Sequence, residues 1–248
     1  MDGNKNMNNN RLEHIQRLYH LLDLLEEKVG GKRLLADCNG RMNWPKRGVY
    51  FFFEPGEFRS TSGAGPRVVR VGTHALKTGS KSTLWKRLSQ HQGVQKSGAG
   101  NHRGSVFRLH VGTALINRDY MVGSYASTWS NGSSASHEIR QEEKPLERAV
   151  SQYIRFMPFL WLAVGDDPGL QSKRGVIERN TISLLSNYFS NHNPQEHIDP
   201  PSDSWLGNFA KSDDIKQSGL WNVNHVREAY SPDFLDLFEY FVNHMIVA

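Results

Sequence analysis

The sequence predicts an α/β fold in which a small, mostly antiparallel central sheet is flanked by helices, with further helical additions at both ends. Two observations support this fold class. Short apolar runs bounded by glycine or proline are typical of strands, and the segments around them carry apolar residues at helical spacing. The 248 residues, 38% of them hydrophobic, suffice for one domain with a substantial core.

The first helix is expected after a polar tail. Residues 1–10 are rich in asparagine and are expected to be disordered. Apolar residues then recur at helical spacing over 12–25, and Gly30 and Gly31 provide the stop. We therefore assign 11–46 to an N-terminal helical extension.

The central sheet is expected to contain four apolar segments. The segment "GVYFFFEPG", 48–56, predicts a strand, and "PRVVRVG", 66–72, predicts its hairpin partner across a Gly/Ser-rich loop. The segments "SVFRLHVG", 105–112, and "RFMPFLWLAV", 155–164, predict two more strands. The sheet would lie within a core spanning 47–193.

Helical spacing or helix-start residues predict four further helices, over 83–91 after Ser82 or Thr83, 146–153 after Pro145, 173–189, and from Ser231-Pro232-Asp233 onward. The last helix would carry Phe234, Phe238, Phe241 and Met245 on one face and would close a C-terminal extension over 194–248. The stretch 124–145 has the composition of a loop.

Composition excludes several classes of protein. With Cys38 as the single cysteine, neither an internal disulfide nor a cysteine-rich zinc site can form. No apolar run is long enough to span a membrane, and the first ten residues lack the apolar region of a secretory signal. We expect a cytoplasmic protein without a membrane partner.

Positive charge is concentrated in one part of the chain. The 61 residues from Phe58 to Arg118 contain eleven lysines or arginines and no acidic residue, whereas the rest of the chain has 19 basic and 25 acidic residues. Such a segment is expected to bind a polyanion, because each contacted phosphate releases counterions. A solvated basic surface without a ligand is the alternative.

Two helices carry charged residues on sides that their apolar spacing assigns to the interior. Arg87 and His91 share a helix face with two leucines, so Arg87 requires an anion or a carboxylate partner, unless it reaches solvent from the edge of the face. Glu178 similarly falls on the apolar side of the helix over 173–189. A buried carboxylate needs a cation, which could be Arg87, another basic side chain or a hard metal ion such as Mg²⁺.

The order of these residues resembles the GIY-YIG nuclease superfamily, whose two name-giving tripeptides lie on adjacent strands and are followed by a helical arginine and a helical metal-binding glutamate. The matching residues, in chain order, are Gly48-Val49-Tyr50, Arg70-Val71-Gly72, Arg87, His91 and Glu178. The resemblance covers about 47–193. The Arg-x-x-x-His pair and the long interval before the glutamate are most similar to GIY-YIG type II restriction endonucleases.

The resemblance implies a role for each residue. Tyr50 would position or deprotonate the attacking water, and Arg87 would bind the scissile phosphate. Glu178 would hold a single divalent ion, Mg²⁺ or Mn²⁺, and His91 would assist the phosphate or the proton transfer. The chemistry is consistent, since phosphodiester hydrolysis requires an activated water and stabilisation of charge on the phosphate oxygens.

One position departs from the family pattern. Arg70 stands where the family has its second tyrosine, and nineteen residues lie between it and Tyr50, more than in the usual hairpin. Either Arg70 serves there as a phosphate ligand, which we favour, or the site has lost activity. His74, close by in the sequence, is a secondary candidate.

The asparagine expected after the glutamate has several candidates. Asn187 is nine residues beyond Glu178 and should point away from the site. Asn191, Asn193 and Asn222 remain, and Asn193 is preferred.

These expectations predict a metal-dependent DNA endonuclease, of the restriction type and sequence-specific by resemblance. The alternative is a catalytically inactive nucleic-acid-binding module on the same scaffold, and a third interpretation is a basic patch for a protein or membrane partner. RNA stays open as a substrate. Cutting both strands of a palindrome would favour a homodimer.

Overall fold

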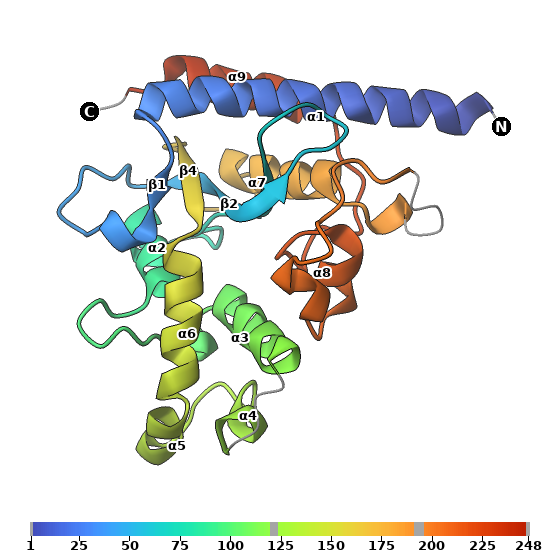
Figure 1. Ribbon diagram of the computed structural model, residues 1–248. Helices are drawn as coiled ribbons and strands as arrows, with labels where there is room; N and C mark the ends of the chain where they lie inside the picture. Colours follow the sequence, from blue (N-terminus) through green and yellow to red (C-terminus); the bar gives the residue numbers. More distant parts are fainter. Residues whose placement is uncertain (1, 120–123, 191–195, 247–248) are drawn as a thin grey trace.

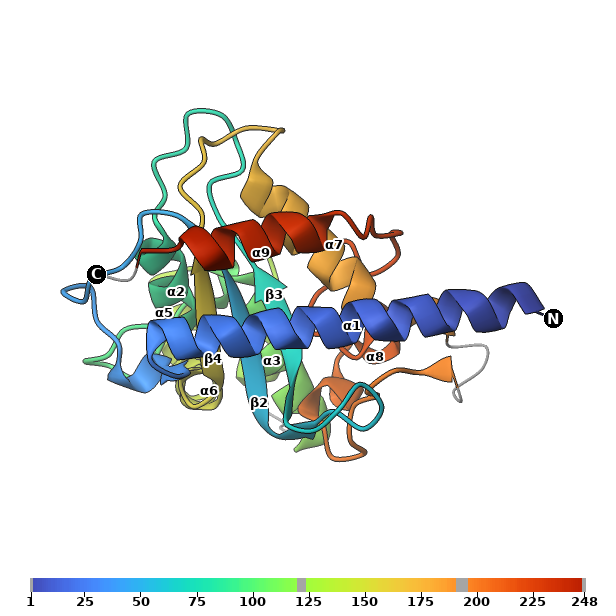
Figure 2. The same cartoon turned by 90° about the horizontal axis from the view of Figure 1, so that it is seen from above.

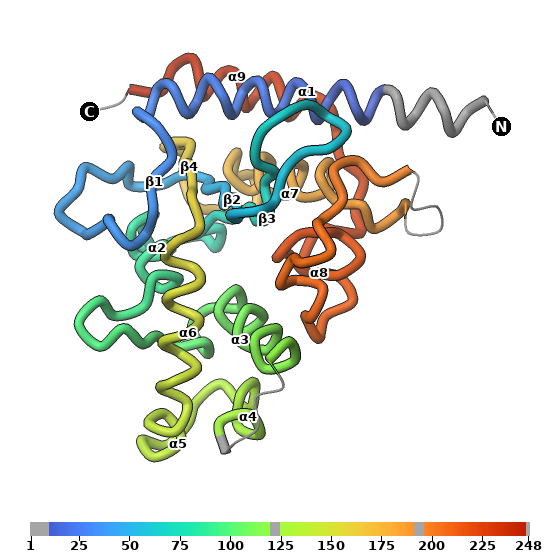
Figure 3. The backbone as a smooth tube through the Cα atoms, viewed as in Figure 1, coloured from blue at the N-terminus to red at the C-terminus, as the bar shows by residue number. Residues whose placement is uncertain are grey.

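The computed structural model describes residues 2–119, 124–190 and 196–246, and Figure 3 follows their backbone from the N-terminus to the C-terminus. Its sheet contains β1 (Arg33–Leu34), β2 (Gly48–Phe58), β3 (Pro66–Gly72) and β4 (Pro158–Ala163) in the order β1-β4-β2-β3, with every neighbouring pair antiparallel. The expected α/β fold and the expected β2–β3 hairpin are confirmed.

Two layers of helices cover the sheet, as Figures 1 and 2 show. Helices α1 (Asp2–Val29) and α9 (Phe234–His244) run side by side across one face, and α7 (Lys173–Leu185) packs against both of them and against the β2–β3 hairpin. The other face carries α2 (Leu84–Gln92), α3 (Val106–Arg118) and α6 (Lys144–Arg155).

Strand β2 shows the period of two that connects these layers. Phe51 lies against Phe238 of α9, with ring centroids 5.6 Å apart. Its neighbour Phe52 points to the opposite face, where the Phe107 ring of α3 lies 5.6 Å away. Because β2 is central and buried on both faces, its sequence is a nearly continuous apolar run.

The segment expected to be a third strand, 105–112, is the beginning of α3, and that prediction is wrong. Ser105 is the N-cap, since its side chain accepts a hydrogen bond from the Arg108 backbone N–H at 3.3 Å. Phe107, Val111 and Ala114 have helical spacing and are all buried. The helical period therefore prevails over the strand propensity of a short apolar run.

Other element boundaries also differ from expectation. Helix α1 begins at Asp2, within the stretch expected to be disordered. Once a helix has formed, each further residue that joins it adds one backbone hydrogen bond, so the helix can extend into a polar segment. The loop-like stretch contains α4 (Ser124–Thr128) and α5 (His137–Glu142). Helix α7 ends at Leu185. The remaining elements are η1 (Leu35–Asp37), η2 (His102–Gly104), η3 (Tyr188–Ser190), η5 (Leu206–Phe209) and α8 (Asp213–Ser218).

The C-terminal part of the chain covers the free edge of β3. The Trp221 backbone N–H donates to the Val69 carbonyl at 2.7 Å. The Asn222 side chain accepts from the Val71 N–H at 3.1 Å and donates to the Val71 carbonyl at 2.8 Å. These bonds satisfy backbone groups that an edge strand would leave open.

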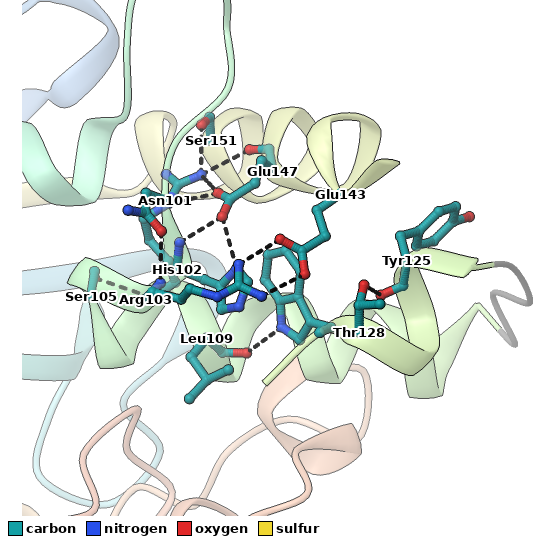
Figure 4. A network of polar contacts seen from close by, with 12 residues as sticks. Asn101, His102, Arg103, Ser105, Leu109, Tyr125, Thr128, Glu143, Glu147 and Ser151 are labelled. Atoms are coloured by element: carbon teal, nitrogen blue, oxygen red, sulfur yellow. Dashed lines mark hydrogen bonds and ion pairs between the residues drawn. The ribbon is translucent and has the colours of Figure 1, made fainter. Parts of the chain in front are cut away.

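Part of the concentrated positive charge is neutralised by ion pairs within the protein. The ion pairs Arg67–Glu57, Arg103–Glu143, Arg108–Glu147 and Arg118–Asp119 join basic residues of the 58–118 segment to acidic residues outside it. Figure 4 shows the polar network around Glu143 and Glu147 that ties η2 and α3 to α6. Sequence charge alone thus overstates the cationic surface. Lys77, Lys81 and Lys86 stay exposed, with no ion-pair partner among the described residues.

Among residues 2–119, 124–190 and 196–246, no helix is both long enough and apolar enough to cross a bilayer.

Candidate active site

Tyr50 lies on β2 directly opposite Gly72 of β3. A Cβ atom built on Gly72 would be only 2.3 Å from the Tyr50 hydroxyl oxygen. The absence of a side chain at Gly72 therefore lets the phenol lie across the neighbouring strand. Arg70 pairs with Phe52, two residues along, so the register places Arg70 and Tyr50 on the same face of the sheet.

The Tyr50 hydroxyl belongs to a chain of buried hydrogen bonds. It lies 2.8 Å from Nε2 of His91 on α2, and Nδ1 of His91 lies 2.9 Å from the Ser105 hydroxyl at the start of α3. Burial lowers the pKa of His91 well below its ordinary value, and Arg87 and Arg70 lower it further. His91 is therefore neutral at pH 7, with one ring nitrogen donating and the other accepting.

Arg70 is a buried cation without a carboxylate partner. Its side chain is buried, yet no ion pair among the described residues includes it. One guanidinium nitrogen donates to the Trp221 carbonyl, Cζ lies 4.5 Å from the centre of the Phe107 ring, and Nε has no hydrogen-bond partner in the same set of residues. Burial lowers the pKa of Arg70, while Tyr50 and Glu178 favour its charged form. Such a group is suited to an anionic ligand.

Arg87 lies on α2 one turn before His91 and is half-buried. Its Nη1 donates to the Gln90 side chain at 3.1 Å, and its buried Nε has no hydrogen-bond partner in the described part of the chain. No ion pair there includes Arg87 either, so the alternative of a structural ion pair is not observed. Arg87 is a second guanidinium with free donors.

Glu178 reaches this group of residues from α7. Its Oε1 accepts a hydrogen bond from the Thr73 backbone N–H, just beyond β3, at 3.0 Å. Burial raises the pKa of Glu178, while His225, Arg70 and Arg87 oppose the shift. Glu178 makes no ion pair with another described residue, so the structure leaves this carboxylate without a direct cationic partner.

Glu178 is the residue that could hold a metal ion. No cluster of three or more His, Cys, Asp or Glu side chains suited to a metal occurs in the residues that the structure describes, which does not fit a zinc centre. One carboxylate oxygen of Glu178 is held by Thr73, and the other has no hydrogen bond within those residues. This arrangement fits an ion such as Mg²⁺, which binds few protein carboxylates and retains several waters.

The secondary candidates lie in different places. His74 is buried near the site, and neither of its ring nitrogens makes a hydrogen bond of good geometry to the described residues. Asn187 points away, as expected, and its amide bonds to the Ile198 backbone. Asn222 is used at the edge of β3. Asn193 and Asn191 lie outside the described residues.

Two contributors to the site, Ser105 and Thr73, were not predicted from the sequence. Ser105 precedes a segment that the sequence predicts as a strand. Its role as an N-cap can be recognised only if that segment is known to be a helix. Thr73 contributes its backbone N–H, which carries no sequence signal.

Stability is expected to fall on mild acidification because neutral histidines are buried near this site. Burial lowers the pKa of His74 and of His110 to about 4. Unfolding returns each imidazole to a pKa of about 6.5, so the unfolded state binds more protons between these values. The free energy of unfolding should drop by about 1 kcal/mol per pH unit for His74 as the pH falls from about 6.5 towards 4.

Urea unfolding at pH 7.5 and pH 5.5 measures this effect, and His74→Gln should reduce the pH dependence. Equal stability of the parent at both pH values would contradict the expectation.

A family model described as GIY-YIG domain matches residues 9–247. No curated protein and no solved structure matches the chain significantly.

Proposed function

Because this chain belongs to the GIY-YIG domain family, we propose that it is a metal-dependent endonuclease that hydrolyses phosphodiester bonds of DNA, of the restriction type and sequence-specific. One observation carries the proposal. The β2–β3 register puts Arg70 on the face of the sheet that carries Tyr50, and Nε2 of His91 on α2 lies 2.8 Å from the Tyr50 hydroxyl. Glu178 of α7 reaches the end of the same hairpin, where it accepts a hydrogen bond from the Thr73 N–H, one residue after Gly72 of β3.

Arg70 and Arg87 are the proposed phosphate ligands. Both have a buried Nε without a partner in the described structure, and neither has a carboxylate to neutralise it. A phosphate would supply acceptors for these donors and would compensate their charge. In this proposal Arg70 replaces the family's second tyrosine as an electrostatic group, stabilising negative charge as it develops on the phosphate oxygens.

Tyr50 and His91 are the proposed proton-transfer pair. A water placed beside the Tyr50 oxygen can transfer its proton to that oxygen as it attacks phosphorus, while the Tyr50 proton passes to His91 Nε2 at 2.8 Å. His91 can accept it because its neutral form predominates. Ser105, bonded to Nδ1, supports the ring from the other side.

Glu178 is the proposed ligand of Mg²⁺ or Mn²⁺. Such an ion supplies Lewis-acid stabilisation of the phosphate oxygens and of the leaving group. Thr73 orients the carboxylate through its backbone N–H, so that the free oxygen can be presented to the ion.

A second candidate function is a nucleic-acid-binding module that grips phosphate but does not cut. The observation in its favour is Arg70 in the position of the second tyrosine. A cytoplasmic location is part of the main proposal, and the lone, buried Cys38 agrees with it. A homodimer would serve cutting of both strands.

The proposed activity is tested by incubating the purified protein with supercoiled plasmid, phage genomic DNA and RNA. We expect discrete DNA fragments with Mg²⁺ or Mn²⁺ and intact DNA when EDTA removes the ion. Intact DNA under all conditions, with a salt-sensitive mobility shift, would favour the binding module. Neither cleavage nor a shift would exclude both functions.

A further inference from the structure

We propose that two adjacent loops, residues 75–82 and 165–171, form an arm that holds duplex DNA beside the active site, with Leu170 entering a groove of the duplex. The proposal rests on the function proposed above. The first loop connects β3 to α2 and the second connects β4 to α7. Figure 2 shows them projecting together from one end of the molecule.

The chain connectivity places both loops next to the candidate site. The 75–82 loop begins just after Thr73, which contacts Glu178, and ends at Thr83, the N-cap of the helix that carries Arg87. The 165–171 loop ends at Ser172, the N-cap of the helix that carries Glu178. A phosphodiester bound at the site would therefore have its flanking duplex near these loops.

Arg174 holds the bases of the two loops together. It is fully buried, pairs with Asp166 in one loop, and donates to the backbone carbonyls of His74 and Ala75 at the start of the other. Ala75 has a positive φ of 56°, a conformation that needs surrounding support in a non-glycine residue. The arm therefore has an ordered base.

The tips of the loops also meet. A Cβ atom built on Gly169 would lie 3.9 Å from the Thr78 hydroxyl, so the residues around Gly169 and Thr78 are neighbours. Leu170 and the flanking lysines of the other loop consequently belong to one projecting surface.

This surface has a net positive charge. Lys77 and Lys81 are exposed and make no ion pair with the described residues. The two acidic residues of the other loop are neutralised, Asp166 by Arg174 and Asp167 by Arg47. Lysines free of carboxylates can contact phosphates and release counterions.

Leu170 is the apolar element at the tip, with 99% of its surface exposed. Isolated exposed leucines are common, but this one projects from a cationic arm whose base adjoins the candidate active site. Apolar side chains of this kind enter grooves or base steps in DNA-binding proteins. A lipid surface is the less suitable ligand, because one leucine and the part-exposed Leu76 offer little apolar area.

The test uses the full chain carrying Glu178→Gln, so that binding is measured without cleavage. Anisotropy of a fluorescent duplex is followed across a range of salt concentrations. Replacing both Lys77 and Lys81 by alanine should reduce the slope of log K against log salt by about 2, since each phosphate contact contributes about 0.9. Leu170→Ser should weaken binding about tenfold at every salt concentration with an unchanged slope, because an apolar contact releases no counterions.

Matched controls are Val94→Ser, at another exposed apolar residue, and the double replacement of the exposed Lys96 and Lys211 by alanine. These variants should bind as tightly as the Glu178→Gln protein. If the arm variants also bind with unchanged affinity and slope while the parent cuts DNA, the arm proposal alone is wrong. A parent that neither binds nor cuts DNA overturns the proposed function and the arm together, and so does binding of anionic lipid vesicles in place of DNA.

Discussion

Replacing Glu178 by glutamine is expected to lower the rate of Mg²⁺-dependent DNA cleavage by about 10³-fold, because a bound ion contributes several kcal/mol to transition-state stabilisation and each 1.4 kcal/mol is a factor of ten. Glutamine keeps a side-chain oxygen that can accept from the Thr73 N–H. It removes the negative charge that the ion requires. The fold should therefore persist while metal-dependent activity is lost.

Single-turnover cleavage rates over a Mg²⁺ titration, together with urea unfolding of the same protein, measure the two effects. Glu54→Gln is the matched control. Glu54 is buried and, like Glu178, has a pKa raised by burial, but it bonds to Tyr153, Trp205 and Trp221 instead of facing the site. If both variants lost cleavage equally, the effect would reflect loss of a buried carboxylate in general. A Glu178→Gln protein as active as the parent would exclude Glu178 as the metal ligand.

Replacing Tyr50 by phenylalanine is the second change with a large expected effect, a loss of about 10²- to 10⁴-fold in cleavage rate. The ring would still pack over Gly72, but the oxygen that contacts His91, and that we propose accepts the proton of the attacking water, would be gone. His91 Nε2 would lose its partner at 2.8 Å, which should destabilise the fold by about 1 to 3 kcal/mol. DNA binding through the arginines should be retained.

Tyr19→Phe separates the catalytic effect from the structural one. Tyr19 is another buried tyrosine, and its hydroxyl accepts a hydrogen bond from the Val68 N–H at 3.0 Å. Its replacement should lower stability by a similar amount and leave cleavage unchanged at a temperature where both variants are folded. Undiminished cleavage by Tyr50→Phe would show that another group activates the water.

The two results also separate the two candidate functions. If the parent cuts DNA only in the presence of the metal ion, and the Glu178→Gln and Tyr50→Phe variants do not cut, the protein is a nuclease that uses both residues. A parent that only binds would assign Arg70 and Arg87 to phosphate recognition without chemistry. Both outcomes use the same two arginines, because neither Arg70 nor Arg87 has a carboxylate partner in the described structure.

Local sequence was a good guide where one pattern dominated. The apolar run of β2 and the glycine stops after α1 predicted elements that the structure confirms, with Gly30 at a φ of 76°. The stretch after Ser105 failed because an eight-residue apolar segment suits a strand or the start of a helix equally well. Only its packing onto α6 and the sheet decides between them.

The candidate site also has features that follow from the local sequence and features that depend on the tertiary structure. The sequence by itself determined the residue types, their order along the chain and the helix faces of Arg87, His91 and Glu178, because these depend on local periodicity. Only the tertiary structure decided that Ser105 supports His91 and that Thr73 orients Glu178. It also decided which cations are free, since pairing partners such as Glu143 and Glu147 come from distant segments. Hydrogen bonds and ion pairs act over a few ångströms in space, so residues far apart in sequence interact only after the chain has folded.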